Sequence, residues 1–326
     1  SAWVLIATGC ILNLLPVSMA GAFFGLSFLV AYFNAKQIAT IHNSLDKLEQ
    51  ILQIYSDLIR CIEKENFRST ELATIHDQLA GNGHTASSCI KKLSRHIGAL
   101  NQRFSAIGVV LNIFTLRDTR MAMKLEQWKK KHGADTGRWF EALASFDAYC
   151  SLAGFAFNHP DYIYPEIADT YFKMEGKALG HPLLRRDICV KNNIYIRKSP
   201  WFLIITGANM AGKSTYLRTI GINYLLGCVG APVCAASLTL YPVQMVTSLR
   251  TSDSLASNES YFFAELKRLK MIIDRLQQGE KLFIILDEIL KGTNSIDKQK
   301  GSFALMKQLV ANQACGIIAT HDLALG

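Results

Sequence analysis

The chain has 326 residues, half of them hydrophobic, and carries a formal net charge of +9 with a pI near 9.1. Such a chain is long enough for two or three folded domains, and its apolar content excludes an intrinsically disordered protein. The basic balance suits either an anionic partner, such as nucleic acid, nucleotide or lipid headgroups, or simply a soluble basic surface. The eight cysteines include no Cys-x-x-Cys pair, so neither a zinc site nor a disulfide framework is expected, and a reducing compartment follows.

The chain begins with a run without charge. Residues 2–33 contain no Asp, Glu, Lys or Arg, and this run exceeds the roughly 20 residues that a helix needs to cross a bilayer. As one helix it would be about 50 Å long, so Pro16 and Gly21 favour a hairpin with a break in the middle. We expect residues 1–35 to be membrane-anchored, and Lys36 favours the cytoplasm for the domains that follow. A buried helical pair inside a large soluble protein is the alternative.

Apolar residues then recur at alternating steps of three and four, first between residues 38 and 62 and again between residues 90 and 107. This spacing is typical of long helices packed on one another, and Gly-Asn-Gly at 81–83 separates the two runs. Residues 36–139 are therefore predicted to form an all-α domain with two antiparallel arms. Such seams are ordinarily structural, and a DNA clamp is the alternative. The basic run 124–133 is likewise either a solvated helix face or a nucleic-acid contact.

From residue 194 the pattern changes to short apolar runs that alternate with amphipathic helices. The runs are WFLIIT (201–206), KLFIILDE (281–288) and CGIIAT (315–320). Because strands buried on both faces read as continuous apolar runs, this pattern is typical of a parallel sheet covered by helices. The C-terminal region is therefore predicted to be α/β.

A phosphate-binding loop follows the first of these runs. Gly207, Gly212, Lys213 and Ser214 fit the pattern G-x-x-x-x-G-K-[ST] between an apolar strand and a helix. The glycines let backbone N–H groups turn toward phosphates, and the helix N-terminus adds partial positive charge. We expect Lys213 to reach the β- and γ-phosphates and the Ser214 hydroxyl to bind Mg²⁺.

The other two runs end in polar side chains suited to hydrolysis. Asp287 is expected to hold the magnesium ion, and Glu288 to position or deprotonate the attacking water. His321, at the end of the third run, would lie beside the γ-phosphate in this topology. Taken singly, the carboxylates could be surface charges and the histidine a structural one.

Several segments together resemble the MutS family, the ATPases of DNA mismatch repair and their relatives. TGANMAGKSTYLRTIG (206–221) resembles the family's P-loop, and SDSLASNESYFFAELKRL (252–269) its signature segment. DEILKGTNSIDKQKGS (287–302) is similar to the stretch that follows the magnesium aspartate, and ATHD (319–322) to the histidine loop. Residues 141–167 and GHPLL (180–184) are similar to the segments that precede the first strands of the family's ATPase domain.

The resemblance implies an ATPase domain over residues 140–326, with ATP and Mg²⁺ as its ligands. The residues that it implies are, for the nucleotide, Gly207, Asn209, Met210, Gly212, Lys213, Ser214 and Thr215; for magnesium, Ser214 and Asp287; and for catalysis, Glu288, His321 and Ser260. Ser260 would act in trans, on the γ-phosphate of the neighbouring subunit. Gly292, Thr293 and Asp297 would join the magnesium site to the subunit interface. A homodimer through the ATPase domains and DNA as a partner are further implications.

The sequence also departs from the family's pattern. In the signature segment, Asn258 and Glu259 stand where mismatch-repair members usually carry Gly and Arg. Lys291 replaces a usual Arg, and Ala211 replaces a glycine of the loop. The mismatch-repair proteins read a mismatch with a Phe-x-Glu motif in an N-terminal domain. No such domain corresponds in this sequence. Residues 263–265 match its letters, but they lie in the signature helix and are expected to be packing.

The sequence therefore predicts an α/β P-loop NTPase domain of the ABC/MutS type, preceded by an all-α arm domain and an N-terminal membrane segment. The predicted function is that of a MutS-like, ATP-hydrolysing and ATP-switched dimer acting on DNA in a mismatch-repair-related role. One alternative is a membrane-tethered, nucleotide-gated scaffold that is not specific for mismatches. Another is an ABC-type transport ATPase, against which the absence of an LSGGQ-like sequence counts.

Overall fold

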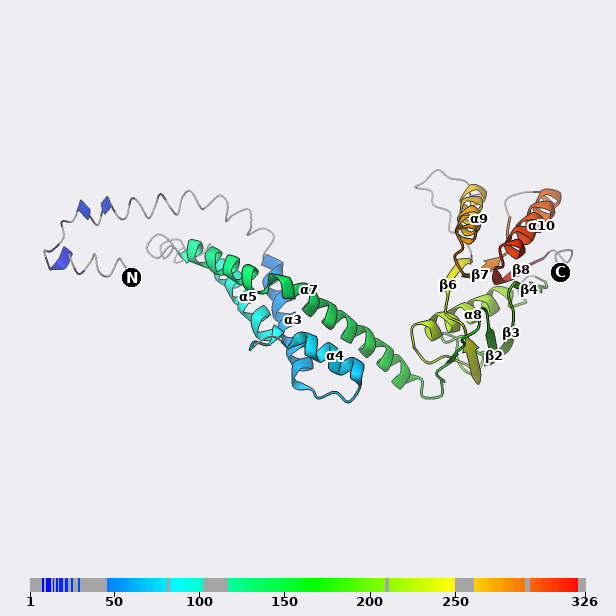
Figure 1. Ribbon diagram of the computed structural model, residues 1–326, viewed down its shortest axis with the longest axis horizontal. Coiled ribbons are helices and arrows are strands. Elements are labelled where there is room, and N and C mark those ends of the chain that lie inside the picture. The colour runs from blue at the N-terminus through cyan, green and yellow to red at the C-terminus, as the bar shows by residue number, and fades with distance from the viewer. Residues whose placement is uncertain are drawn as a thin grey trace. The chain divides into compact units, whose positions relative to one another are not determined.

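The fold is given by a computed structural model of the chain (Figure 1). It describes residues 46–80, 83–101, 117–208, 211–249, 261–290 and 294–321, and scattered positions between residues 8 and 29. The chain forms two compact units, residues 1–151 and 152–326.

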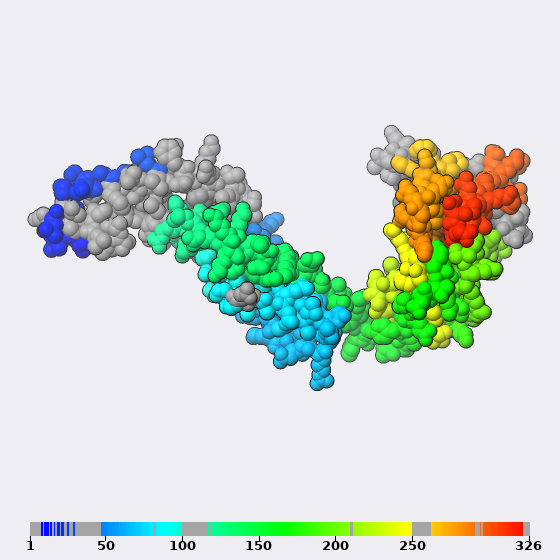
Figure 2. Space-filling model, viewed as in Figure 1, coloured from blue at the N-terminus to red at the C-terminus, as the bar shows by residue number. Residues whose placement is uncertain are grey.

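The described part of the first unit is helical. Its helices are α3 (Asp46–Lys64), α4 (Thr70–Leu79), α5 (Ala86–Asn101) and α7 (Arg117–Asn158), and the last of these runs on into the second unit. The side chain of Ser56 donates to the carbonyl of Ser87 at 3.0 Å, and that of Ser94 to the carbonyl of Glu49 at 3.1 Å. Because the partner numbers run in opposite directions, α3 and α5 are antiparallel. Figure 2 shows the blue-to-cyan and green segments of this unit in close contact.

The apolar seams account for the core between these helices. Ile59 and Ile62 of α3 are buried together with Ile90 and Ile97 of α5, because a spacing of three or four places them on one helix face. Two tryptophans of α7, Trp128 and Trp139, complete this cluster. Each seam residue within the described ranges therefore falls on a helix. The other seam residues lie outside these ranges, namely Ile38, Ile41, Leu45, Phe104 and Ile107.

One helix of this unit, α4, was not predicted from the sequence. The predicted break between the two seams, at residues 81–83, differs from the structure in this respect, because α3 already ends at Lys64 and the separate helix α4 follows. The polar stretch at residues 63–66 and Ser69, at the N-cap position of α4, mark this earlier break.

No helix in the described residues is long and apolar enough to cross a membrane. Most of the predicted membrane segment, residues 1–35, lies outside the described positions. The apolar side chains that are described there, including Ile11, Leu14 and Met19, are exposed. The membrane segment stays a prediction from the sequence.

The second unit contains two four-stranded sheets. Its strands are β1 (Glu166–Ile167), β2 (Met174–Leu179), β3 (Asn192–Ile196), β4 (Trp201–Thr206), β5 (Ser237–Leu240), β6 (Gln244–Ser248), β7 (Leu282–Asp287) and β8 (Cys315–Thr320), and its other helices are α8 (Lys213–Cys228), α9 (Tyr261–Gln277) and α10 (Ser295–Ala311). One sheet has the order β1-β5-β2-β3, in which β2 is antiparallel to both β5 and β3, and β1 is parallel to β5. The other has the order β4-β8-β7-β6 and is parallel throughout.

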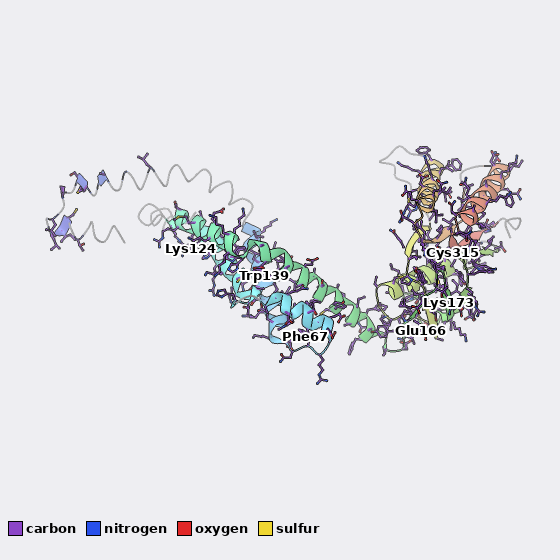
Figure 3. All side chains as sticks on the ribbon, viewed as in Figure 1. Phe67, Lys124, Trp139, Glu166, Lys173 and Cys315 are labelled. Atoms are coloured by element: carbon purple, nitrogen blue, oxygen red, sulfur yellow. The ribbon has the colours of Figure 1, made fainter. Side chains whose placement is uncertain are left out.

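Helices cover both faces of the parallel sheet. Leu217, Ile220 and Tyr224 of α8 pack in one apolar cluster with Phe283, Ile285 and Ile317 of the sheet. The alternate residues Ile284, Leu286 and Ile318 pack in a second cluster with α9 and α10. Successive strand residues point to opposite faces of the sheet. A continuous apolar run therefore packs against the helices on both faces. All six residues of β8 are buried, and Figure 3 labels the first of them, Cys315. The prediction of a parallel α/β sheet is thus confirmed by the structure.

Candidate nucleotide site

The carboxyl ends of three adjacent strands define the candidate site. β8 lies between β4 and β7, with Thr320 paired in register to Thr206 and Ala319 to Asp287. The loop after β4, the acidic pair at the end of β7 and the histidine after β8 therefore meet at one edge of the sheet. Ligands of open α/β sheets bind at this edge.

The loop after β4 has the geometry of a phosphate cradle. Gly212 has a φ of 86° and precedes the first residue of α8, and Gly207 has a φ of 153°. Glycine adopts such angles without the steric cost that a Cβ adds. The loop leads directly into the N-terminus of α8, where unpaired backbone N–H groups and the helix dipole favour an anion. Asn209 and Met210, which the sequence analysis placed in this loop, lie outside the described residues.

Lys213 and Ser214 occupy the first turn of α8. Lys213 is 8% exposed, and its amino group donates to the carbonyl oxygens of Gly207 and Ala208 at 2.7 and 2.8 Å. The ammonium group thus lies within the loop, where it can exchange these carbonyls for phosphate oxygens. The Ser214 hydroxyl donates to Oδ2 of Asp287 at 2.7 Å, although the two residues are 73 positions apart.

The donor set around Asp287 fits a magnesium ion. Oδ1 of Asp287 is buried and has no hydrogen-bond partner among the described residues. A buried carboxylate oxygen without a partner is costly unless a ligand satisfies it. Together with the Ser214 hydroxyl it offers the one or two protein oxygens that Mg²⁺ takes beside phosphates and water.

Glu288 and His321 form the second polar pair of the site. His321 Nε2 and Glu288 Oε1 are 2.8 Å apart, and both side chains are partly exposed. The backbone of Glu288 continues the sheet for one residue, because its N–H donates to the carbonyl of Ala319. Its φ is 52°, a left-handed conformation that costs a non-glycine residue on the order of 1–3 kcal/mol and that is concentrated at functional sites.

A hollow of about 580 Å³ adjoins the loop, and its volume lies within the range of small-molecule sites. Gly212, Lys213 and Thr215 line one part of it. Its apolar part includes Ile188 and Val190, whose side chains are exposed. A ligand with phosphate groups at the loop and a flat apolar ring against Ile188 and Val190 would fit this hollow.

One further residue of the site was missed from the sequence. Glu265 of α9 is 3% exposed, and its Oε1 accepts the backbone N–H of Leu290 at 2.7 Å. Leu290 has a φ of 58°, so this carboxylate holds the second left-handed residue of the turn after β7. Glu265 belongs to the motif that the sequence analysis set aside as packing. It is buried as expected, but it also fixes the segment that carries Glu288.

Removing this carboxylate should loosen the turn after β7. We expect Glu265→Ala to lower the free energy of unfolding by about 1–3 kcal/mol, because the buried N–H of Leu290 loses its acceptor. Hydrogen–deuterium exchange should show faster exchange of the peptide that contains Leu290. Glu265→Gln, which keeps an acceptor oxygen, and Lys270→Ala, at an exposed position of the same helix, should exchange like the parent chain. Unchanged protection in Glu265→Ala would contradict this role.

The remaining predicted positions divide into two groups. Ser260, Lys291, Gly292 and Thr293 lie outside the described residues, as do Asn258 and Glu259. Asp297 lies in the first turn of α10, where its N–H donates to the Asn294 side chain at 2.9 Å. In the described chain Asp297 thus takes part in a helix cap.

A glycine-framed loop between a strand and a helix, followed in the next strands by Asp-Glu and His, defines a P-loop nucleotide-binding unit. Residues 203–326 match the model of MutS domain V, and this match relates the C-terminal unit to the MutS family.

Curated relatives extend the match beyond this segment. The chain is 33% identical over 196 residues to MutS protein homolog 4 of Homo sapiens and 32% identical over 196 residues to the DNA mismatch repair protein MutS of Thermotoga sp. (strain RQ2). It is 32% identical over 222 residues to DNA mismatch repair protein MutS 1 of Haloarcula marismortui. These alignments cover 59%, 59% and 64% of this chain, but only 20%, 24% and 23% of the relatives. The aligned part of the chain thus spans about a fifth to a quarter of each relative's length.

Proposed function

We propose that the chain is the ATPase-bearing part of a MutS-like protein, which binds and hydrolyses ATP and acts as an ATP-switched dimer on DNA. The observation that carries the proposal is the meeting of Lys213, Ser214, Asp287, Glu288 and His321 at one sheet edge, within the segment that matches MutS domain V. Two of the relatives are named as DNA mismatch repair proteins, which supports DNA as the partner.

Binding of ATP would use the loop and the first turn of α8. Lys213 would turn from the loop carbonyls to the β- and γ-phosphates, and the backbone N–H groups of the loop would hold the same phosphates. Ser214 and Asp287 would hold Mg²⁺, which when bound neutralises charge on the phosphate oxygens. The adenine ring would lie in the apolar part of the adjoining hollow, against Ile188 and Val190.

Hydrolysis would be carried by Glu288. A carboxylate at this position can accept a proton from a water molecule that is in line with the γ-phosphate. His321, within hydrogen-bond distance of the Glu288 carboxylate, would orient it or contact the γ-phosphate.

The switch would require a second copy of the chain. In this proposal Ser260 of one subunit reaches the γ-phosphate of the other, so that two ATP molecules are enclosed between two ATPase domains. The support is the resemblance of residues 252–269 to the family's signature segment. ATP would favour the closed dimer through its higher affinity for that state, and hydrolysis would release it.

DNA binding should depend on both nucleotide and salt. We expect the detergent-solubilised chain to bind plain, mismatched or branched duplexes more tightly with ATP than without, with an affinity that falls linearly with salt on logarithmic axes because phosphate contacts release counterions. Fluorescence anisotropy across a salt series measures both effects. The Lys213→Ala variant is the control, since it should keep the salt dependence and lose the effect of ATP.

The other outcomes of this experiment discriminate between functions. Equal DNA affinity with and without ATP would contradict the ATP switch. No DNA binding at any salt concentration would contradict DNA as the partner. ATP binding with negligible turnover and no DNA binding would instead favour the nucleotide-gated scaffold. An ABC-type transport ATPase is not favoured, because the matching family model is that of MutS domain V.

Membrane anchoring with the ATPase domain in the cytoplasm is a separate proposal. Its support is the charge-free run of residues 2–33. Flotation with lipid vesicles, comparing the chain with one that lacks residues 1–35, tests it. Equal flotation of both chains would contradict membrane anchoring through residues 1–35.

A further inference from the structure

A hollow of about 390 Å³ lies between α5 and α7 in the helical unit, well apart in sequence from the P-loop. Lys92 of α5 and Lys124 and Lys131 of α7 line it. Lys124 and Lys131 are seven residues apart, which puts them on one helix face two turns from each other. Trp128, between them, is buried and donates its indole N–H to the carbonyl of Cys89 on α5 at 2.9 Å. The two lysine-bearing faces are thus held against each other, and Figure 3 labels Lys124 on α7.

The positive charge of this hollow has no partner in the described chain. None of the three lysines forms an ion pair there with a described carboxylate. The nearby acidic residues have other partners, since Asp135 pairs with Arg138 at 3.0 Å and Glu63 accepts the N–H of Ser87 at 3.0 Å. Three ammonium groups around one concave surface favour an anion.

Histidines are further polar groups of the hollow, beside Ser88 and Gln127. His84, His96 and His132 also line it. Burial, followed by the charges of Lys124 and Lys92, lowers the pKa of His96, and burial followed by Lys131 and His84 lowers the pKa of His132. No group of three His, Cys, Asp or Glu side chains in the described ranges is arranged to hold a metal ion. Neutral imidazoles beside lysines are therefore available as hydrogen-bond donors to an oxyanion.

We propose that this hollow is a binding site for a small polyphosphate anion. Its volume lies in the range of small-molecule sites, roughly 300–1,000 Å³, and is too small to enclose a nucleic-acid duplex. Lysine is suited to phosphate as a strongly hydrated point charge, and three lysines match the charge of two or three phosphate groups. Two lysines of the basic run 124–133, Lys124 and Lys131, would thus bind the anion and not only face solvent. It does not depend on the nucleotide site at the P-loop.

The test is titration calorimetry of the full chain with inorganic pyrophosphate. The chain carries Lys213→Ala, which weakens phosphate binding at the P-loop, and all lysine variants of the hollow are compared in this background. We expect the triple variant Lys92→Gln, Lys124→Gln and Lys131→Gln to weaken pyrophosphate binding by about tenfold or more, because it removes three charge-assisted contacts. The matched control is Lys91→Gln, Lys129→Gln and Lys130→Gln, which removes the same charge from the same two helices outside the hollow.

The control triple should change the affinity by less than about twofold, since its lysines do not line the hollow and charges outside it are screened by salt. Equal losses in both triples would overturn the proposal in favour of a general basic surface. Binding of anionic vesicles or of a short duplex without pyrophosphate binding would overturn it in favour of a lipid or nucleic-acid surface. Circular dichroism checks the fold of each variant, and the single variants Lys124→Gln and Lys129→Gln repeat the comparison if a triple variant unfolds.

Discussion

Replacing Glu288 with glutamine should lower the turnover number for ATP by about 10²–10⁴-fold, the range for loss of a general base, and should leave ATP binding in place. The amide keeps the shape of the side chain but cannot take a proton from water. Its oxygen can still meet His321 at the 2.8 Å distance of the native pair. Phosphate release under single-turnover conditions measures the rate, and a fluorescent ATP analogue measures binding.

A matched glutamate tests whether the effect is local. Glu280 lies just before β7, at the opposite end of the strand from Glu288, and pairs with Arg275 on the surface. Glu280→Gln should hydrolyse ATP at the parent rate. Ser260→Ala should likewise bind ATP and lose turnover. It should bind ATP because Ser260 would contact the nucleotide of the other subunit and not the one held by its own loop. Full turnover in Glu288→Gln would mean that another group activates the water.

The second large effect is expected at the phosphate loop. Lys213→Ala should weaken ATP binding by about 2–5 kcal/mol, or roughly 30-fold and upward, because a nearly buried ammonium group is removed from the phosphates. The fold should persist, since the Lys213 amino group contacts only loop carbonyls of its own loop among the described atoms. Equilibrium binding of a fluorescent ATP analogue measures the loss, and thermal unfolding checks the fold.

Two other variants sharpen this result. Lys213→Met keeps most of the side-chain volume and should bind ATP as poorly as Lys213→Ala, which would assign the loss to charge and not to packing. Lys300→Ala, at an exposed position of α10, should bind ATP like the parent chain. Tight ATP binding by both Lys213 variants would place the phosphates elsewhere.

The parts of the second unit with strong local signals could be predicted from the sequence. Residues 201–206 and 315–320 form strands with the expected bounds, because strands buried on both faces need uninterrupted apolar runs. The Ser214–Asp287 contact also follows the motif chemistry. By contrast, β6 reads QMVTS, a mixed run without clear alternation, and it was not anticipated.

Contacts that depend on strand order or helix pairing could not be derived in this way. The Glu288–His321 pair exists because β8 lies between β4 and β7, an order that differs from the order along the chain. Glu265 reads as an ordinary helix residue, since its partner Leu290 lies 25 positions away across β7. The lysines of the basic hollow come together only through the packing of α5 on α7.

The position of β8 also bears on the order in which the unit folds. It is the last of the described strands in the chain, yet both of its neighbours, β4 and β7, bond to it and not to each other. The parallel sheet therefore cannot close until residues 315–320 insert, and pairing with β4 spans more than a hundred residues of chain. Contacts this distant in sequence form slowly. During synthesis or refolding, the edges of β4 and β7 stay open to wrong partners until that insertion, and the ability to bind nucleotide arrives only with it.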